Sequence, residues 1–127
     1  MINYYRFKSN LFKKNGGGMT NIIKRNTNRF KELLDGIELQ NLAVGKKTHM
    51  VKFFLKEGKV LPNHRHIQEQ TGYMIRGKMV LTIGGEDCLV ETGDSWSIES
   101  NVLHSARIIE DSEVIEVFSP LREDYLD

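Results

Sequence analysis

The sequence predicts an all-β, single-domain protein built as an antiparallel sandwich or barrel, and two observations carry this prediction. From residue 37 onward, short runs rich in β-branched and aromatic residues recur about every 8–12 residues, with turn-forming residues between them. The Gly84-Gly85 pair can supply the positive φ angles of a tight hairpin. At 127 residues the chain fits one domain with a substantial core.

The amino-terminal part of the chain differs in composition from the rest. Residues 1–18 are basic and aromatic and end in a glycine triplet. We interpret them as a flexible leader, a segment derived from cloning, or an upstream start ahead of Met19. Residues 19–36 are expected to form an N-terminal extension, and 37–127 the β-barrel domain.

One short helix is predicted, at 26–34 (NTNRFKELL) within this extension. Asn26 or Thr27 can cap its start, and Gly36 follows its end. The barrel is therefore expected to follow either this short helix or an irregular leader.

Strands are predicted for the rest of the chain. Each expected strand is short, and each is bounded by glycine, asparagine, aspartate or serine. The expected strands are Thr48–Leu55, Tyr73–Ile75, Met79–Ile83, Cys88–Val90, Ser95–Ile98, Ala106–Ile109 and Val114–Phe118. The expected turns include Arg76-Gly77-Lys78, Gly84 to Asp87, Thr92-Gly93-Asp94 and Glu110-Asp111-Ser112.

Composition excludes several classes of partner and site. The 18 basic and 17 acidic residues give a net charge of +1, so neither nucleic acid nor an anionic membrane is expected as a partner. No stretch approaches the roughly 18 apolar residues of a membrane-spanning helix. Cys88 is the single cysteine, which excludes an intrachain disulfide and a multi-thiolate metal site and suits a cytoplasmic location.

Three of the four histidines are gathered in two glycine-flanked patterns. His64 and His66 alternate along a predicted strand, so their imidazoles point to the same face. Three neutral imidazoles and one oxygen donor suit a first-row divalent ion such as Zn, Ni, Fe or Mn. The alternative is that the two neighbouring histidines are exposed on a surface strand and bind no metal. The patterns are Gly58-x5-His64-x-His66-x3-Gln70-x6-Gly77 and Gly93-x10-His104.

These two patterns resemble the two motifs of the cupin superfamily, over about residues 37 to 122. The first differs at Gln70, where the family usually has Glu. The second carries Glu99, Asn101 and Ile108 where the family usually has Pro, Gly and Asn. The resemblance implies a small jelly-roll β-barrel with one divalent transition metal inside. The ligands it implies are His64, His66, Gln70 and His104.

The amide of Gln70 changes the physics of such a site. A neutral oxygen donor leaves the site one negative charge poorer, which lowers metal affinity and makes the bound ion more electrophilic. It also removes the carboxylate of the two-histidine, one-carboxylate iron sites, which disfavours an iron oxygenase. Glu69 offers an alternative carboxylate, but a shift of one residue turns its side chain to the other face.

A narrower resemblance is to the small pectin-degradation cupins, which convert 4,5-unsaturated monouronates into linear keto sugars. This resemblance lies in the sequence around the ligands, residues 64–73, and in the closing run from Glu116 to Tyr125. Their closing strand holds an Asp, a Phe and an Arg; here these positions are Glu116, Phe118 and Arg122. The resemblance implies that these three act in catalysis, with the longer Glu116 as a departure.

The residues themselves agree with that role. Glu116 and Phe118 share a strand face, a carboxylate beside a metal can carry a proton, and Arg122 can hold a sugar carboxylate through two hydrogen bonds. The alternative is a salt bridge between Glu116 and Arg122 at the rim, with Phe118 in the core. We expect His49 to be a satisfied strand histidine and Trp96 to pack in the barrel.

Three functions follow from these predictions. The first is a metal-dependent enzyme that acts on a small-molecule sugar acid. The second is a non-catalytic cupin that binds a metal or small ligand, and the third is a cupin dioxygenase or another isomerase, since one fold hosts many chemistries. The resemblance also implies a homodimer, for which the segment from Ile37 to Leu42 can supply an exchanged strand.

Overall fold

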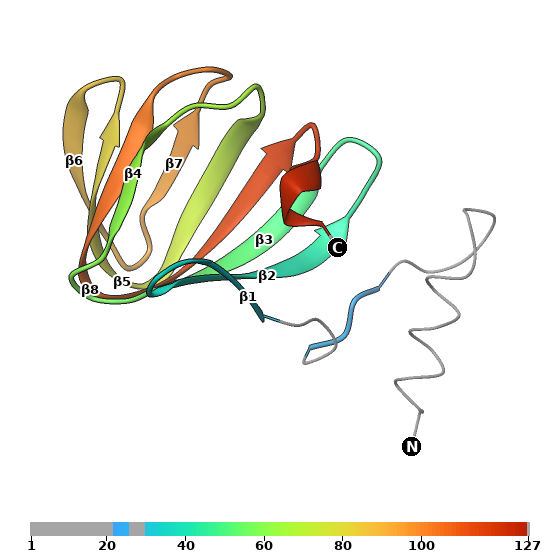
Figure 1. Ribbon diagram of the computed structural model, residues 1–127, viewed down its shortest axis with the longest axis horizontal. Coiled ribbons are helices and arrows are strands. Elements are labelled where there is room, and N and C mark those ends of the chain that lie inside the picture. The colour runs from blue at the N-terminus through green and yellow to red at the C-terminus, as the bar shows by residue number, and fades with distance from the viewer. Residues whose placement is uncertain (1–21, 26–29, 127) are drawn as a thin grey trace.

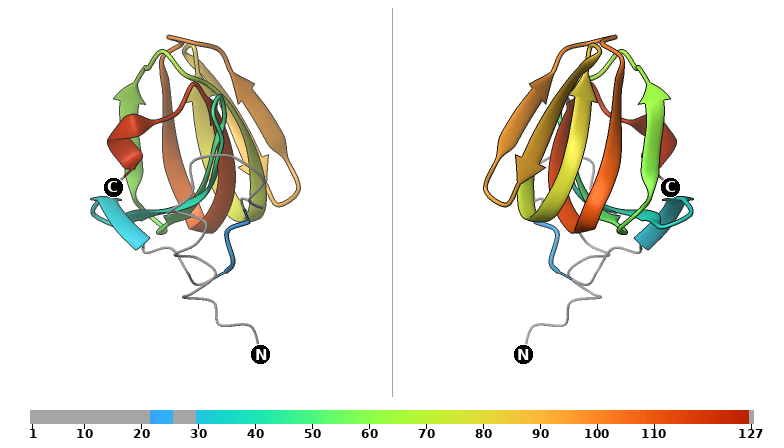
Figure 2. Two further views of the ribbon diagram at one scale, coloured as in Figure 1. Left: turned by 90° about the vertical axis from the view of Figure 1, so that its right-hand side faces the viewer. Right: turned by 90° about the vertical axis from the view of Figure 1, so that its left-hand side faces the viewer.

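A computed structural model describes residues 22–25 and 30–126, and the leader at residues 1–18 lies outside them. The described chain is almost entirely β, as predicted, with strands curved around a common interior (Figures 1 and 2). The strands are β1 (Phe30–Leu34), β2 (Ile37–Val44), β3 (His49–Leu55), β4 (Val60–His64), β5 (Glu69–Ile83), β6 (Glu86–Glu91), β7 (Ser95–Ile98) and β8 (His104–Ser119), and the 3-10 turn η1 (Glu123–Tyr125) follows.

Two long strands, β5 and β8, connect the two walls of the barrel. In one wall, the first half of β5 pairs with the second half of β8. There β5 also pairs with β7 and β8 also pairs with β3, and β2 and β1 extend the wall beyond β3. The other halves of β5 and β8 pair with each other and with β6 and β4. All of these pairings are antiparallel, which gives the predicted sandwich or barrel.

The predicted helix at 26–34 is wrong over its described part. Residues Phe30–Leu34 form β1, and residues 26–29 lie outside the described part of the chain. Gly36, with φ 76°, turns the chain into β2, and the ring of Phe30 packs edge-on against Phe54 at 4.9 Å. Pairing with β2 and this aromatic contact override the helix propensity of the segment.

Two predicted turns are bends inside long strands. Arg76 to Lys78 lies within β5, and Glu110 to Ser112 lies within β8, where the two strands face each other. The register between the strands shifts on both sides of Gly77, whose φ is 120°. The hydroxyl of Ser112 accepts from the backbone N–H of Lys78 at 3.0 Å. Bulged pairing therefore continues through residues that usually end a strand.

Replacing Gly77 with alanine is expected to destabilise the fold by about 2–3 kcal/mol, because it combines backbone strain with a clash. A Cβ at this position would lie 2.2 Å from the Ser112 hydroxyl and 2.6 Å from its Cα. Gly85→Ala is the matched control, since Gly85 has φ 83° and nothing within 4 Å of an added Cβ. Urea unfolding should give the larger loss for Gly77→Ala; equal losses would contradict this account of the bend.

The core lies between the two walls and is closed by side chains from every long strand. Ile37, Leu39 and Val51 are fully buried, which places the start of β2 in the core of its own chain. Trp96 is half-buried and packs against the core, as expected. No helix in residues 22–25 and 30–126 is long and apolar enough to cross a membrane.

Candidate metal centre and adjoining cavity

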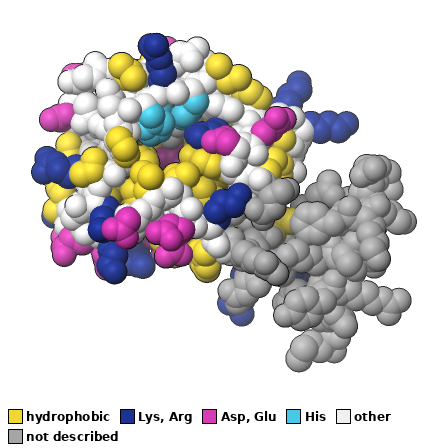
Figure 3. Space-filling view, viewed as in Figure 1, with side chains coloured by type: hydrophobic (Ala, Val, Ile, Leu, Met, Phe, Trp, Pro, Cys, Tyr) yellow, Lys and Arg dark blue, Asp and Glu magenta, His cyan; other side chains and the backbone are white. Residues whose placement is uncertain are grey.

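Three histidines converge at the mouth of the barrel. His64 ends β4, His66 follows it in the connecting loop, and His104 begins β8, where it pairs with His64 across the strands. The ring of His104 lies 4.1 Å from that of His64 and 5.0 Å from that of His66. One nitrogen from each ring lies within 4.8 Å of the others. Figure 3 shows histidine side chains gathered beside a hollow lined by apolar atoms.

The orientation of each imidazole is fixed by its backbone. In all three rings Nδ1 bonds a nearby carbonyl: Pro62 at 2.7 Å for His64, Gln68 at 2.9 Å for His66 and Val102 at 2.9 Å for His104. A carbonyl can only accept, so Nδ1 carries the proton and Nε2 keeps its lone pair. This is the arrangement by which proteins orient metal-binding histidines.

The loop before His104 holds this geometry despite its unusual sequence. Asn101 adopts φ 64°, a left-handed conformation that asparagine tolerates better than most residues and that glycine usually supplies. Its backbone N–H donates to the carbonyl of His66 at 2.8 Å, and the Ser100 hydroxyl donates to that of Ile67 at 2.5 Å. The loop therefore ties the segment carrying His66 to the segment carrying His104.

Gln70 adds an amide to the groups that line this part of the cavity. It points inward from β5, is 6% exposed, and its Nε2 donates to Oε2 of Glu116 at 2.9 Å. Its Oε1 and the Nε2 of His66 are buried without a hydrogen-bond partner. Buried polar atoms without partners are rare, and a bound metal ion would satisfy both. The residues present thus fit one divalent ion. Glu69, in contrast, is exposed on the other face of β5.

Burial favours the neutral imidazole at His66 and His104. It lowers the pKa of His104 to about 4, although the hydrogen bond to the Val102 carbonyl acts in the opposite direction. It also lowers the pKa of His66, and the positive charge of Arg122 adds to that effect. Only the neutral imidazole binds a metal, so the cavity favours the required protonation state.

Glu116 lies behind Gln70 rather than at the rim. Its side chain is buried, Oε1 accepts from Trp96 Nε1 at 2.8 Å, and Oε2 accepts from Gln70. Burial raises the pKa of Glu116 to about 7, against the effect of the two hydrogen bonds. The alternative prediction of an ion pair between Glu116 and Arg122 is wrong, because the partner of Arg122 is Asp124.

Arg122 is held rigidly in the wall of the same cavity. Its Nε and Nη2 donate to the two oxygens of Asp124, at 3.1 and 2.8 Å. The guanidinium lies 4.0 Å from the centre of the Tyr125 ring and 5.1 Å from that of Phe118. Both rings are buried, so a charged fork with further donors is fixed beside the histidines. The sequence alone did not indicate that Asp124 and Tyr125 hold Arg122, apart from their nearness to it along the chain.

His49 positions the backbone of Arg122, and it is satisfied at both nitrogens, as expected. Nδ1 accepts from the N–H of Arg122 at 3.2 Å, which leaves Nε2 to donate to Oδ1 of Asn41 at 2.7 Å. Nδ2 of Asn41 in turn donates to the carbonyl of Tyr125 at 2.8 Å. A network from β2 and β3 therefore fastens the carboxyl-terminal segment that carries Arg122.

Replacing His49 with alanine is expected to lower the free energy of unfolding by about 3 kcal/mol at neutral pH, since it leaves a cavity and unpaired polar groups. Burial, aided by the charge of Arg122, lowers the pKa of His49 in the fold, while the charge of Asp124 opposes this. The unfolded state therefore takes up the proton first, and the contribution of His49 is complete above about pH 6.5 and declines on acidification.

Urea unfolding of wild type and His49→Ala at several pH values checks this. The difference between the two proteins should shrink as the pH falls from 7.5. For Asn41→Ala, which removes no titrating group, the loss should depend less on pH. A difference for His49→Ala that stays constant down to pH 5 would contradict a neutral, buried His49.

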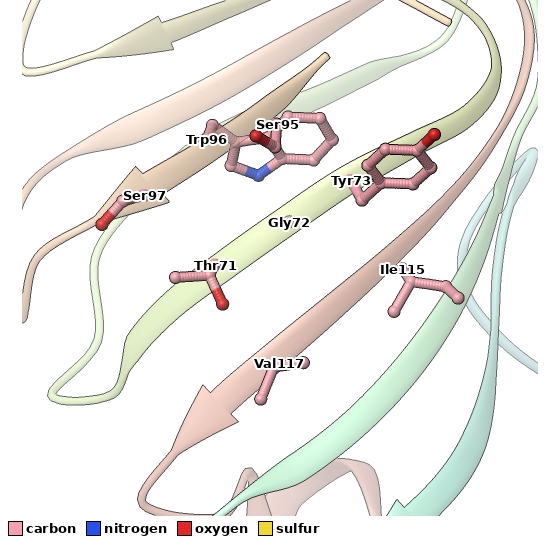
Figure 4. A pocket seen from close by; sticks show the side chains of 8 residues that line it. All are labelled: Thr71, Gly72, Tyr73, Ser95, Trp96, Ser97, Ile115 and Val117. Atoms are coloured by element: carbon pink, nitrogen blue, oxygen red, sulfur yellow. The ribbon is translucent and has the colours of Figure 1, made fainter. Parts of the chain in front are cut away.

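The site opens into the interior of the barrel, and a second hollow lies on the outside. The inner cavity has a free volume of ≈ 50 Å³ and is lined both by polar residues such as Gln70 and by apolar residues such as Leu81 and Val114. The outer hollow is shallow and lies over β5, β7 and β8 (Figure 4). Tyr73 lines this outer hollow and is 48% exposed, so it does not line the inner cavity.

Comparisons with known proteins agree with the fold and the site. The cupin domain family matches residues 51–119. The chain belongs to the cupin family. It is 31% identical over 99 residues to the pectin degradation protein KdgF of Dickeya dadantii (strain 3937), an alignment that covers 76% of this chain and 90% of that protein.

Two solved structures are similar to this protein over most of the chain. The structure of KdgF from Halomonas sp. has a TM-score of 0.79 at 27% identity and covers 84% of this chain and 99% of its own. An RmlC-like cupin from Shewanella frigidimarina NCIMB 400 has a TM-score of 0.80 at 23% identity and covers 84% and 96%. The predicted resemblance to a small pectin-degradation cupin is therefore confirmed, together with the jelly-roll fold.

Proposed function

We propose that this cupin is a metal-dependent enzyme that opens 4,5-unsaturated monouronates into linear keto sugars. One observation carries the proposal: the inner cavity brings a set of four neutral donors together with a carboxyl group and a fixed guanidinium. The similarity to a pectin degradation protein supports a substrate of the sugar-acid class.

The proposed ligands are His64, His66 and His104 through Nε2, and Gln70 through Oε1. The ion is a divalent transition metal, Zn, Ni, Fe or Mn. When bound, such an ion acts as a Lewis acid that polarises an oxygen of the substrate. The four donors carry no negative charge, so the full charge of the ion faces the substrate.

The reaction is an isomerisation, so substrate and product have the same atoms. The bond between the anomeric carbon and the ring oxygen breaks with its electron pair going to the oxygen, and the anomeric hydroxyl loses its proton to become a carbonyl. The resulting enolate takes up one proton at carbon 4 as it becomes a ketone. Glu116 is proposed to carry a proton at Oε2, the oxygen that faces Gln70.

Arg122 and Phe118 are proposed to position the substrate. The guanidinium is already oriented by Asp124 and Tyr125, so its remaining donors can bind the uronate carboxylate as a pair of parallel hydrogen bonds. Phe118 is 2% exposed and its ring lies 5.8 Å from that of His66, so it closes the wall between the metal ligands and Arg122.

The test is a rate measurement with the purified chain and 4,5-unsaturated monouronates. The conjugated double bond absorbs in the ultraviolet and is lost on conversion, so absorbance follows the reaction. We expect acceleration with metal-loaded protein, none after treatment with a chelator, and recovery on adding the metal back. No acceleration over the spontaneous reaction would contradict the proposal and favour a non-catalytic ligand-binding cupin. Oxygen consumption with the iron-loaded protein would instead favour a dioxygenase.

Two further expectations belong with this proposal: a homodimer and a cytoplasmic location. In this structure Ile37 and Leu39 of β2 are buried in their own chain, and β1 forms the edge of the sheet. A dimer that exchanges β2 would have to open this pairing, whereas one that adds to β1 would not. Light scattering of the purified chain tests the expected mass of two copies.

A further inference from the structure

Trp96, on an edge strand of the sheet, contacts Glu116, the hydrogen-bond partner of Gln70. Trp96 lies on β7 and shares an inward face with Ile98. It pairs across the strands with Gly72 of β5, and Gly72 in turn pairs with Glu116 of β8. The indole occupies the space above Gly72, since a Cβ there would lie 2.2 Å from Trp96 Cε2. Because Gly72 has no side chain, the indole can lie over it and Nε1 can reach Glu116.

The contact with Trp96 leaves Glu116 one remaining oxygen for Gln70. Oε1 accepts from the indole at 2.8 Å, and Oε2 accepts from the amide nitrogen of Gln70 at 2.9 Å. An amide has one donor end and one acceptor end, so a carboxylate facing the nitrogen fixes which end points the other way. That end is Oε1 of Gln70, which is buried and without a partner.

We propose that Trp96 is a positioning residue for the metal centre, acting through Glu116 to hold the oxygen of Gln70 toward the ion. This proposal rests on the four-ligand centre of the proposed function. It adds a specific role for a residue that is not itself a ligand. Glu116 supplies the acceptor that fixes the amide of Gln70, and it lies one hydrogen bond behind the oxygen proposed to bind the ion. Partners of this kind determine ligand orientation and basicity in other metal sites.

The test is the affinity for Zn²⁺, measured by competition with a chromophoric chelator, so that no substrate is required. Trp96→Phe keeps a ring over Gly72 but removes the N–H, and we expect the dissociation constant to rise about tenfold. Glu116→Gln has a single acceptor, which cannot serve both partners, and we expect a rise of about 10- to 100-fold. Tyr73→Phe is the matched control: it removes a hydroxyl from an aromatic on the outer face and should leave the affinity unchanged.

Gly72→Ala gives an independent route, because it displaces the indole without removing any polar group. It should weaken Zn²⁺ binding in the wild-type background and have little further effect in the Trp96→Phe background. Thermal unfolding of the metal-free variants accompanies each titration, so that affinity is compared among folded proteins.

The outcomes separate the two proposals. Wild-type protein that binds Zn²⁺ with the same affinity as Trp96→Phe and Gly72→Ala would overturn the role of Trp96 while leaving the metal centre intact. Wild-type protein that binds no metal would overturn both. Weaker binding in Trp96→Phe and Gly72→Ala, with unchanged binding in Tyr73→Phe, is the result that the contact through Gly72 predicts.

Discussion

Replacing His104 with alanine is expected to lower the affinity for Zn²⁺ by more than the ~100-fold typical for loss of an outer-shell partner. His104 lies between the other two histidines, 4.1 and 5.0 Å from their ring centres, and it is 3% exposed. Its loss would remove a proposed ligand and open the buried side of the centre to water. Isothermal titration of the metal-free protein measures the change.

The same substitution should abolish stabilisation by metal. A ligand at 100 times its dissociation constant stabilises a fold by about 2.7 kcal/mol, so Zn²⁺ should raise the unfolding temperature of the wild type and leave that of His104→Ala unchanged. Arg65→Ala is the matched control, because Arg65 is exposed between His64 and His66. Equal stabilisation of wild type and His104→Ala by Zn²⁺ would place the metal elsewhere.

Arg122→Met is expected to lower kcat/KM for the uronate by about 10²- to 10⁴-fold, because it removes two hydrogen bonds to a charged group worth about 1.5–3 kcal/mol each. Methionine keeps an apolar stem against Phe118 and Tyr125, so the packing of the cavity wall is largely retained. Steady-state kinetics on the metal-loaded variant measure the effect.

Metal binding separates this prediction from a general disturbance of the site. Arg122→Met should bind Zn²⁺ as the wild type does, since Arg122 is not among the proposed ligands. Arg122→Lys keeps the charge but not the fork, and an intermediate rate is expected from it. Wild-type kinetics in Arg122→Met would contradict a role for this residue in holding the substrate carboxylate.

The part of the site predicted from the sequence is the part encoded in local spacing. Alternation placed His64 and His66 on one face, and a glycine-flanked pattern indicated His104; the structure brings the three together. The face shared by Glu116 and Phe118 follows from the same period of two, and both are buried. Strand β7 coincides with the predicted Ser95–Ile98 because turn residues bound it on both sides.

Features that depend on contacts between distant segments could not be predicted from local spacing in the sequence. The segment at 30–34 has helix-forming residues, yet pairing with β2 makes it a strand. Gly77 has the appearance of a turn residue, but its partner Ser112 comes from β8, and only the pairing of β5 with β8 shows that the chain bends rather than reverses.

The polar network around the centre is similarly non-local. The indole of Trp96 meets Glu116 because Gly72 lies between them in the sheet, a juxtaposition of three strands. The role of His49 depends on Asn41 and on the backbone of Arg122, which is 73 residues away along the chain. Local periodicity predicts that these side chains point inward but not which partners they meet.

The most direct measurement of the central claim is the location of Zn²⁺ in crystals of the metal-loaded protein by anomalous diffraction. We predict one peak per chain, about 2.0–2.2 Å from Nε2 of the three histidines and Oε1 of Gln70, with Glu116 outside the coordination shell and hydrogen-bonded to Trp96. A metal bound directly by Glu116 with Gln70 turned away, or a peak outside the barrel, would contradict the neutral four-ligand centre.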